Sequence, residues 1–215
     1  MVSEVPLYPQ RYFGVPAKLV SYILHPLFIP TYVFFWLLIR FPFQFEGITP
    51  QLLFFREFNV FWITAFFPAF SVFLLWRLKL IDNLHLRTQK ERIVPYIITM
   101  IFYWWMWYLS RNFTDQPSTL QYFYFGIFVT TIFGLIINSF IKISMHAMGI
   151  AGAFVFVLVV CFVNQTFLGG DICAITLLTG LVCTARFLLH THSNTEVYAG
   201  LFIGALSQVI AFTIL

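Results

Sequence analysis

Long apolar stretches are the feature that most constrains this chain. Seven can be marked along its 215 residues, and each approaches the roughly 20 residues that a helix needs to cross the core of a bilayer. They run over Ala17–Ile39, Phe58–Trp76, Ile93–Ser110, Gln121–Ile141, Ala147–Val163, Ile172–Leu189 and Val197–Leu215. Backbone polar groups in lipid must be satisfied within their own segment, so these stretches predict an all-α, polytopic bundle of transmembrane helices.

The composition leaves no room for a separate soluble domain. Only 9% of the residues are charged, against about a quarter in soluble domains, and 60% are hydrophobic. We therefore expect residues 1–215 to form a single integral membrane domain. Residues 1–16 contain three prolines and lack the basic start and unbroken apolar core of a cleaved signal peptide, so they predict a short interfacial lead-in.

The first apolar stretch is interrupted by HPLFIP, His25 to Pro30. Proline removes a backbone donor and clashes with the preceding turn, so its two prolines predict a kinked, broken or re-entrant element. The chain is thus expected to have six or seven spans. We interpret His25, beside the first proline, as a structural residue.

The connections between the stretches differ in character. Residues 77–95, RLKLIDNLHLRTQKERIVP, form the one long charged segment and hold five of the twelve Lys and Arg residues. GGDI, Gly169–Ile172, predicts a tight turn. The spacing in GLFIG, Gly200–Gly204, predicts close packing between helices.

Most of the reactive side chains lie in three connections that a helical bundle places on one membrane face. Successive crossings reverse direction, so the connections after the second, fourth and sixth stretches share a face. Their reactive residues are His85, Arg87, Lys90 and Arg92, then Lys142, Ser144 and His146, then Arg186, His190, His192 and Glu196. Ionisable groups at a membrane are costly unless they are paired or hydrated, so this gathering predicts a functional site.

These residue types suit the cleavage of a phosphate ester. Arginine donates in a fixed fork that matches tetrahedral oxyanions, and serine adds a hydroxyl donor. His192 and Glu196 are four residues apart, so on a helix the carboxylate can reach the imidazole and leave its other nitrogen free to attack. His146, from another connection, can protonate a leaving oxygen. His190 is interpreted as a structural or rim residue, and Lys142 as a headgroup anchor.

One segment resembles a signature of a known family. ARFLLHTHSNTEVYAG, which ends at Gly200, is similar to the third signature of the type 2 phosphatidic acid phosphatase (PAP2) superfamily. In that signature Ser-Arg is followed after five residues by His and after three more by Asp. The spacing corresponds here to Arg186, His192 and Glu196.

Two further segments extend the resemblance. ISMH, Ile143–His146, is similar to the second signature, Pro-Ser-Gly-His, and retains Ser144 and His146. RTQKERIVP, Arg87–Pro95, is a weaker match to the first, a Lys followed after six residues by Arg-Pro. The resemblance covers residues 87–204 and implies a PAP2-like core.

The resemblance also implies a mechanism. In the family, the third-signature His is the nucleophile and forms a phosphohistidine, its acidic partner orients it, the second-signature His donates a proton, and no metal is required. By this resemblance His192 is the nucleophile, Glu196 its orienting partner and His146 the acid. The implied phosphate ligands are Arg186, Ser144 and Arg92, with Lys90 or Arg87 in place of the signature lysine, whose register is taken by His85.

Several positions depart from the family pattern. Ala185 replaces Ser, Glu196 replaces Asp, Ile143 and Met145 replace Pro and Gly, and Arg92 is followed by Ile rather than Pro. Glu keeps the charge but adds a methylene, and Met145 puts a side chain where backbone can approach the phosphate. These changes keep open an alternative, a lipid-phosphate-binding or transport protein that retains the pocket but has lost turnover.

Metal-dependent membrane enzymes are weaker alternatives. An intramembrane prenyltransferase holds Mg²⁺ on paired aspartates, but Asp82, Asp115 and Asp171 are far apart in the sequence. His146, His192 and Glu196 can formally hold one zinc ion.

We therefore expect a membrane lipid phosphatase that hydrolyses a phosphomonoester or pyrophosphate of a lipid or prenyl substrate, without a metal cofactor. Its partners are that substrate and the membrane lipids, with no nucleic acid. We expect it in a bacterial inner (cytoplasmic) membrane. The site is expected on the extracytoplasmic face, as is usual in the resembled family. Lys and Arg counts outside the candidate phosphate ligands are too even to decide the orientation.

Overall fold

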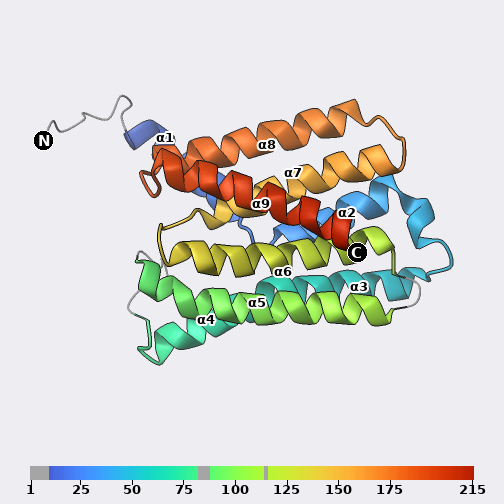
Figure 1. Cartoon of the computed structure of the whole chain (residues 1–215), viewed down its shortest axis with the longest axis horizontal. Helices are drawn as coiled ribbons and strands as arrows, with labels where there is room; N and C mark the ends of the chain where they lie inside the picture. Colours follow the sequence, from blue (N-terminus) through green and yellow to red (C-terminus); the bar gives the residue numbers. More distant parts are fainter. Residues whose placement is uncertain (1–9, 82–87, 114–115) are drawn as a thin grey trace, which may run out of the picture.

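The computed structural model describes residues 10–81, 88–113 and 116–215, and within these ranges the chain forms helices and short connections without a strand (Figure 1). Six helical segments are long and apolar enough to cross a membrane. They are the continuous segment Pro50–Arg77, α5 (Gln89–Asn112), α6 (Ser118–Asn138), α7 (Met145–Val163), α8 (Gly169–Leu188) and α9 (Asn194–Ile214). This confirms the predicted all-α, polytopic bundle of transmembrane helices.

The first apolar stretch is broken, as its prolines predict. It forms α1 (Gln10–Ile23) and α2 (Ile29–Arg40), separated by a turn in which the Phe28 amide donates to the His25 carbonyl over 2.9 Å. Pro30 lies in the first turn of α2, where its missing N–H costs nothing. At 1.5 Å per residue, the 12 residues of α2 extend about 18 Å, less than a bilayer core.

The first full span contains a π-helical turn. It consists of α3 (Pro50–Phe61), the π-turn η2 (Trp62–Phe66) and α4 (Phe67–Arg77), and follows the short 3₁₀ helix η1 (Pro42–Phe45). Pro68 cannot donate to the carbonyl four residues earlier, and the Phe67 amide donates instead to the Trp62 carbonyl, five residues back. The proline thus explains the change of helix type.

The span begins at Pro50, earlier than the predicted Phe58. Arg56, which interrupts the apolar pattern in the sequence, is buried inside the span. The Arg56 guanidinium lies over the Phe113 ring, 5.0 Å from its centroid, and donates to the Gln116 side chain over 3.4 Å. A charge packed in this way does not end a helix, although it interrupts the apolar pattern in the sequence.

The tight turn predicted at GGDI is wrong, because α8 begins at Gly169. The turn is made earlier, where Gln165 adopts a left-handed conformation with φ of 51°. Asp171 then lies in the first turn of α8, where the helix dipole favours a carboxylate. It accepts hydrogen bonds from Arg40 over 2.6 Å and from Trp36 over 3.1 Å, which ties α8 to α2.

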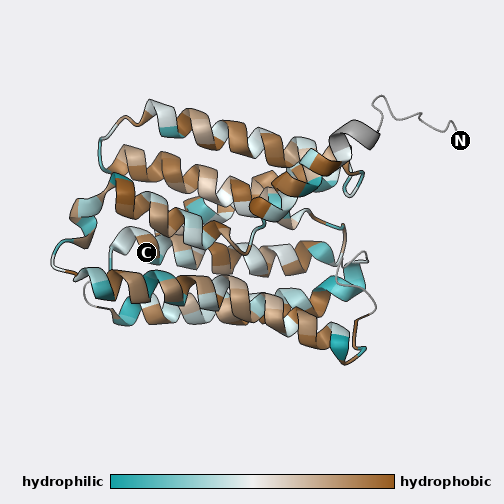
Figure 2. Ribbon diagram, turned by 180° about the vertical axis from the view of Figure 1, so that it is seen from behind, coloured by the Kyte–Doolittle hydropathy of each residue, from teal (hydrophilic) through white to brown (hydrophobic). Residues whose placement is uncertain are grey.

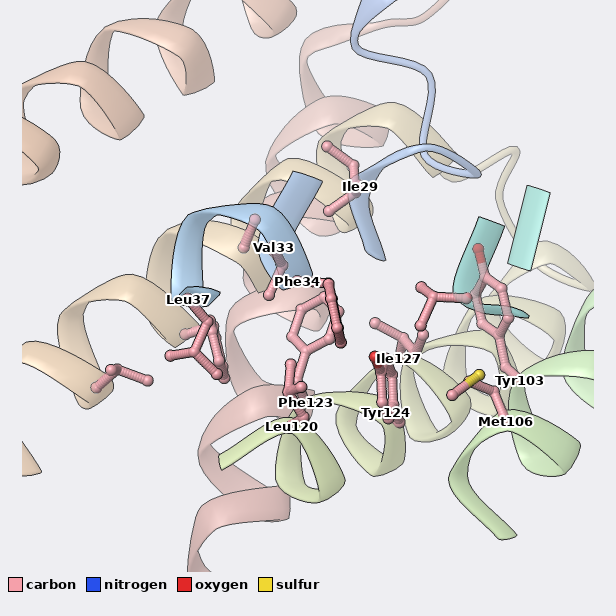
Figure 3. Packing of buried hydrophobic residues seen from close by; sticks show 14 of the residues in the cluster. Ile29, Val33, Phe34, Leu37, Tyr103, Met106, Leu120, Phe123, Tyr124 and Ile127 are labelled. Carbon is pink, nitrogen blue, oxygen red and sulfur yellow. The ribbon is translucent and has the colours of Figure 1, made fainter. Parts of the chain in front are cut away.

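Large side chains from α2, α5 and α6 meet in the interior of the bundle (Figure 3). Phe34, Leu37, Phe123 and Tyr124 are fully buried there. Many outward-facing side chains of the long helices are also large and apolar, Trp105 and Phe202 among them, and brown apolar residues run along the helices in Figure 2. Apolar side chains on both faces are typical of helices surrounded by lipid.

Two glycines bring α7 and α9 into close contact. A Cβ at Gly204 would lie 2.1 Å from the Met148 carbonyl oxygen, and one at Gly200 would lie 2.8 Å from the Ser144 carbonyl oxygen. The packing role predicted for GLFIG is therefore confirmed. The contact sets the N-terminal ends of α7 and α9 against each other.

Candidate active site

The helix ends that carry the predicted site residues meet at one end of the bundle. The ends of α4, α6 and α8 and the starts of α5, α7 and α9 lie on the left in Figure 1, as predicted for connections that share a face. The Arg92 Nη1 on α5 donates to the Ile143 carbonyl over 3.0 Å, and the Ser144 amide donates to the Glu196 carbonyl over 3.1 Å. These bonds join the N-terminal ends of α5, α7 and α9.

His192 is held by two acceptors at one ring nitrogen. Its Nδ1 lies 2.7 Å from Oε2 of Glu196 and 3.2 Å from the carbonyl oxygen of Lys142. A carboxylate and a carbonyl can only accept, so Nδ1 carries the proton and Nε2 keeps its lone pair. The side chain of His192 is 5% exposed, so its position is fixed by packing as well as by hydrogen bonds.

The local sequence explains why Glu196 points at His192. Ser193 caps α9 by accepting from the Glu196 amide over 3.4 Å, and the Glu196 carboxylate accepts from the Ser193 amide over 3.3 Å. This capping box turns the carboxylate back over the start of the helix, where His192 enters. The same carboxylate oxygen serves the cap and the imidazole.

Burial lowers the pKa of His192 from its ordinary value of 6.5 to about 4, despite the opposing effect of the Glu196 hydrogen bond. The nearby positive charges of Arg92 and Lys142 also lower this pKa. His192 is therefore neutral at pH 7, the state in which Nε2 can act as a nucleophile.

Arg186 is buried in the last turn of α8. It is 6% exposed, and within the described part of the chain its Nε and Nη2 have no hydrogen-bond partner. Its charge acts on His25 and His146, so the three side chains lie near one another. Buried guanidinium donors are normally satisfied, and an oxyanion is the ligand that best fits their fork.

Arg92 and Ser144 are also buried in this region. Arg92 lies close enough to Glu196 to interact with its charge, and its own positive charge acts on His192. Ser144 is fully buried and caps α7, with Oγ accepting from the Ala147 amide over 3.4 Å. Its hydroxyl hydrogen remains available to a ligand, and the first amides of α7 add the positive end of a helix dipole.

His146, in the first turn of α7, contacts the break between α1 and α2. Its Nε2 lies 3.0 Å from the Ser21 carbonyl oxygen, an acceptor, so Nε2 carries a proton and Nδ1 is the nitrogen left for exchange. Its ring packs edge to face on the ring of His25, with 5.1 Å between centroids.

Other predicted residues are not brought into this cluster. Lys90 is exposed, and two positions along a helix from Arg92 it points to the opposite side of α5. Arg87 and His85 lie outside the described residues. His190 is exposed and has φ of 49°; its amide donates to the Phe187 carbonyl over 3.0 Å and so helps to end α8.

An apolar cavity of about 280 Å³ lies beside the site, lined by the α1–α2 break and by α2, α4, α5, α6 and α7. Four prolines line it, one from each of the break, α2, α4 and α5, and Gly149 and Gly152 line it from α7. Tyr96, one turn after Arg92, and Met145, next to His146, connect the cavity wall to the site. Residues that bend or thin helices thus make room inside the bundle.

The zinc site considered from the sequence is not formed. Among the described residues, no three His, Cys, Asp or Glu side chains are arranged as a group that could hold a metal ion. His146, His192 and Glu196 lie in one region, but their nitrogens and oxygens do not converge on a common point.

The sequence reasoning missed the position of His25 and the cap at each of two helix starts. His25 was interpreted as structural, yet it contacts His146 and lines the cavity. The signal was present, because a broken helix at membrane depth is tolerated where it lines a cavity. TQKE at Thr88–Glu91 and SNTE at Ser193–Glu196 have the spacing of capping boxes, which the sequence alone could have indicated.

No protein-family model, curated protein or solved structure matches this chain. The likeness to the phosphatidic acid phosphatases therefore rests on the three quoted segments.

Proposed function

We propose that this chain is a membrane lipid phosphatase that forms a phosphohistidine on His192. The observation that carries the proposal is the pair formed by His192 and Glu196, in which Nδ1 is protonated and held while Nε2 is free. An imidazole held in this tautomer is a nucleophile, and the carboxylate stabilises the positive charge that develops on the ring during attack.

The arginines supply the phosphate site. Arg186 offers two nitrogens that have no hydrogen-bond partner within the described residues, and Arg92 is buried where its charge acts on His192 and Glu196. A phosphoryl group between them would satisfy the Arg186 donors and offset the cost of burying positive charge. Ser144 and the amides at the start of α7 add further donors.

His146 supplies the proton for the leaving oxygen. Its Nε2 is held by the Ser21 carbonyl, so Nδ1 is the nitrogen that carries the transferable proton when the ring is protonated. After the lipid alcohol or phosphate leaves, the same nitrogen can take a proton from the water that hydrolyses the phosphohistidine.

The cavity beside the site accounts for a lipid substrate. It is apolar, shares His25 with the charged end and lies among the long apolar helices of the bundle. A chain of methylenes or isoprene units in this cavity is favoured by burial of apolar surface. Phosphomonoesters and pyrophosphates carrying such chains are therefore the proposed substrates.

The experiment is phosphate release by the purified protein in detergent from a panel of lipid phosphates and prenyl pyrophosphates. We expect release by the native chain and a loss of at least about 1,000-fold in His192→Ala, because the nucleophile is absent. His190→Asn is the matched control, since His190 is exposed and Asn tolerates its left-handed backbone. The activity is expected to persist with a chelator.

The panel also separates the proposal from the alternative of a lipid-phosphate-binding protein. That alternative predicts saturable binding of a lipid phosphate with no phosphate release by any variant. It also predicts that His192→Ala retains binding while Arg186→Ala loses it. Release that is unchanged in His192→Ala would show that another group is the nucleophile.

A further inference from the structure

His25 lies outside the residues assigned to the proposed phosphatase site, yet the fold brings it to His146. The last turn of α1 and the break that follows it hold the His146 ring from two directions. The Ser21 carbonyl accepts a hydrogen bond from its Nε2–H over 3.0 Å, and the His25 ring packs against it edge to face at 82°. Pro26 fixes the backbone directly after His25, so the contact depends on the broken helix.

The hydrogen bonding of His25 determines where its proton lies. The Leu27 amide donates to His25 Nδ1 over 3.3 Å, so this nitrogen acts as an acceptor and carries no proton. Neutral His25 is therefore protonated at Nε2. Within the described part of the chain, this N–H has no hydrogen-bond partner.

His25 belongs both to the charged end and to the apolar cavity. It lines the cavity together with Tyr96 and Gly149, while the charge of Arg186 acts on it. A lipid phosphate with its phosphoryl group at Arg186 and its chain in the cavity must pass this boundary. The atom at the boundary is the oxygen that joins the phosphorus to the chain.

We propose that His25 is a catalytic residue, whose Nε2–H donates a hydrogen bond to the bridging oxygen of a lipid phosphate. This inference rests on the proposed function. When Nε2 of His192 bonds to phosphorus, the bond from phosphorus to the bridging oxygen breaks and its electron pair moves to that oxygen. Protonated His146 gives the oxygen its Nδ1 proton, while His25 keeps its own proton and stabilises the developing negative charge.

Stabilisation of a leaving oxygen depends on how basic that oxygen is, and this gives a specific test. Dodecyl phosphate leaves as a strongly basic alkoxide, whereas para-nitrophenyl phosphate leaves as a weakly basic phenolate that needs little help. His25→Phe keeps an aromatic ring against His146 but removes the donor. We expect kcat of this variant to fall by about 100-fold on dodecyl phosphate and by less than about 3-fold on para-nitrophenyl phosphate.

A structural role for His25 predicts something different, namely equal losses on both substrates, and that result would overturn the proposal. His25→Gln, which restores an N–H donor, should recover part of the dodecyl phosphate activity. If His25→Phe does not elute as a folded protein, His25→Gln is compared with the native chain on the same two substrates instead. If the native chain hydrolyses neither substrate, the proposed phosphatase function itself fails. If it hydrolyses both and His25→Phe is unaffected, only the role of His25 fails.

Discussion

Two acceptors at one nitrogen, the carboxylate of Glu196 and the carbonyl of Lys142, decide which end of the His192 ring can react. Because both accept hydrogen bonds from the Nδ1–H, the reactive nitrogen is Nε2. Only Glu196 carries a charge, and only a charge can stabilise the imidazolium that forms during attack. Both acceptors therefore orient the ring, but only Glu196 activates it.

This division leads to a prediction for Glu196→Gln. The amide keeps an acceptor for His192 and can still form the capping box with Ser193, so stability should change little. Loss of the charge should lower kcat by about 100-fold, less than the loss of the nucleophile, because the Lys142 carbonyl still holds the tautomer. Phosphate release and thermal unfolding in detergent measure the two effects, and a large drop in the unfolding midpoint would contradict the assignment.

The lowered pKa of His192 also predicts a pH dependence of stability. Its folded-state value of about 4 lies below the ordinary 6.5, so between these values the unfolded chain binds more protons than the folded one. The contribution of neutral His192 to the stability of the fold is therefore present above pH 6.5 and is lost as the pH falls towards 4.

We expect the thermal midpoint of the native chain to fall more steeply from pH 6.5 to 4 than that of His192→Gln, which cannot titrate there. The other buried histidines are present in both proteins and contribute to both curves. Parallel curves over this range would contradict the lowered pKa.

At the scale of single residues, spacing alone predicted part of the site. His192 and Glu196 could be paired because four residues make one turn of a helix, and the structure brings them together. His25 could not be paired with His146, because a contact across 121 positions depends on how the break between α1 and α2 packs against α7. Lys90 was predicted from charge, but its direction depends on the start of α5.

At the scale of helices, the contact between α7 and α9 determines whether the site can form. Their N-terminal ends carry His146 and Glu196, and the glycines on α9 let the backbones approach closely enough for the Ser144 amide to donate to the Glu196 carbonyl. Any side chain at these glycines must push the helices apart.

Gly204→Ala tests this contact. A Cβ there would lie 2.1 Å from the Met148 carbonyl oxygen, which is backbone and cannot rotate away. We expect a loss of stability of about 1–3 kcal/mol and a matching drop in phosphate release, because the two helix ends move. Gly180→Ala on α8 is the control, since nothing lies within 4 Å of its Cβ. Equal midpoints for the two variants would contradict the packing.

The helices were predictable to the extent that apolar length and proline define them. The six spans and the broken first stretch follow from these signals, since lipid requires helices and proline interrupts them. The start of α8 could not be predicted. Asp171 in GGDI is typical of a turn, but in the structure it lies in the helix and accepts hydrogen bonds from Arg40 and Trp36 of α2. Pro68 indicates an interruption of the helix, but the π-turn itself depends on the carbonyl to which the Phe67 amide donates.

At the scale of the whole molecule, the bundle has two polar ends of different character. One end carries the candidate site; the other carries the ion pair of Arg40 and Asp171 and connections such as that between α7 and α8. Teal residues gather towards both ends in Figure 2. The proposed extracytoplasmic position of the site assigns each end to a membrane face.

Cysteine labelling distinguishes the two faces. In a chain whose three native cysteines are replaced, Asn194→Cys places a thiol at the exposed start of α9, and Thr166→Cys places one in the exposed connection at the opposite end. We expect a membrane-impermeant maleimide to label intact bacterial cells only through Asn194→Cys. Labelling of Thr166→Cys alone would place the site on the cytoplasmic face.

The most direct measurement of the central claim is the trapping of the phosphoenzyme. A lipid phosphate labelled in its phosphoryl group is mixed with the native chain, the reaction is quenched with alkali, and the labelled peptide is identified by mass spectrometry. We expect an acid-labile phosphoryl group on His192, absent in His192→Ala and present in His190→Asn. Turnover with the label on another residue, or turnover without any labelled protein, would contradict the central claim.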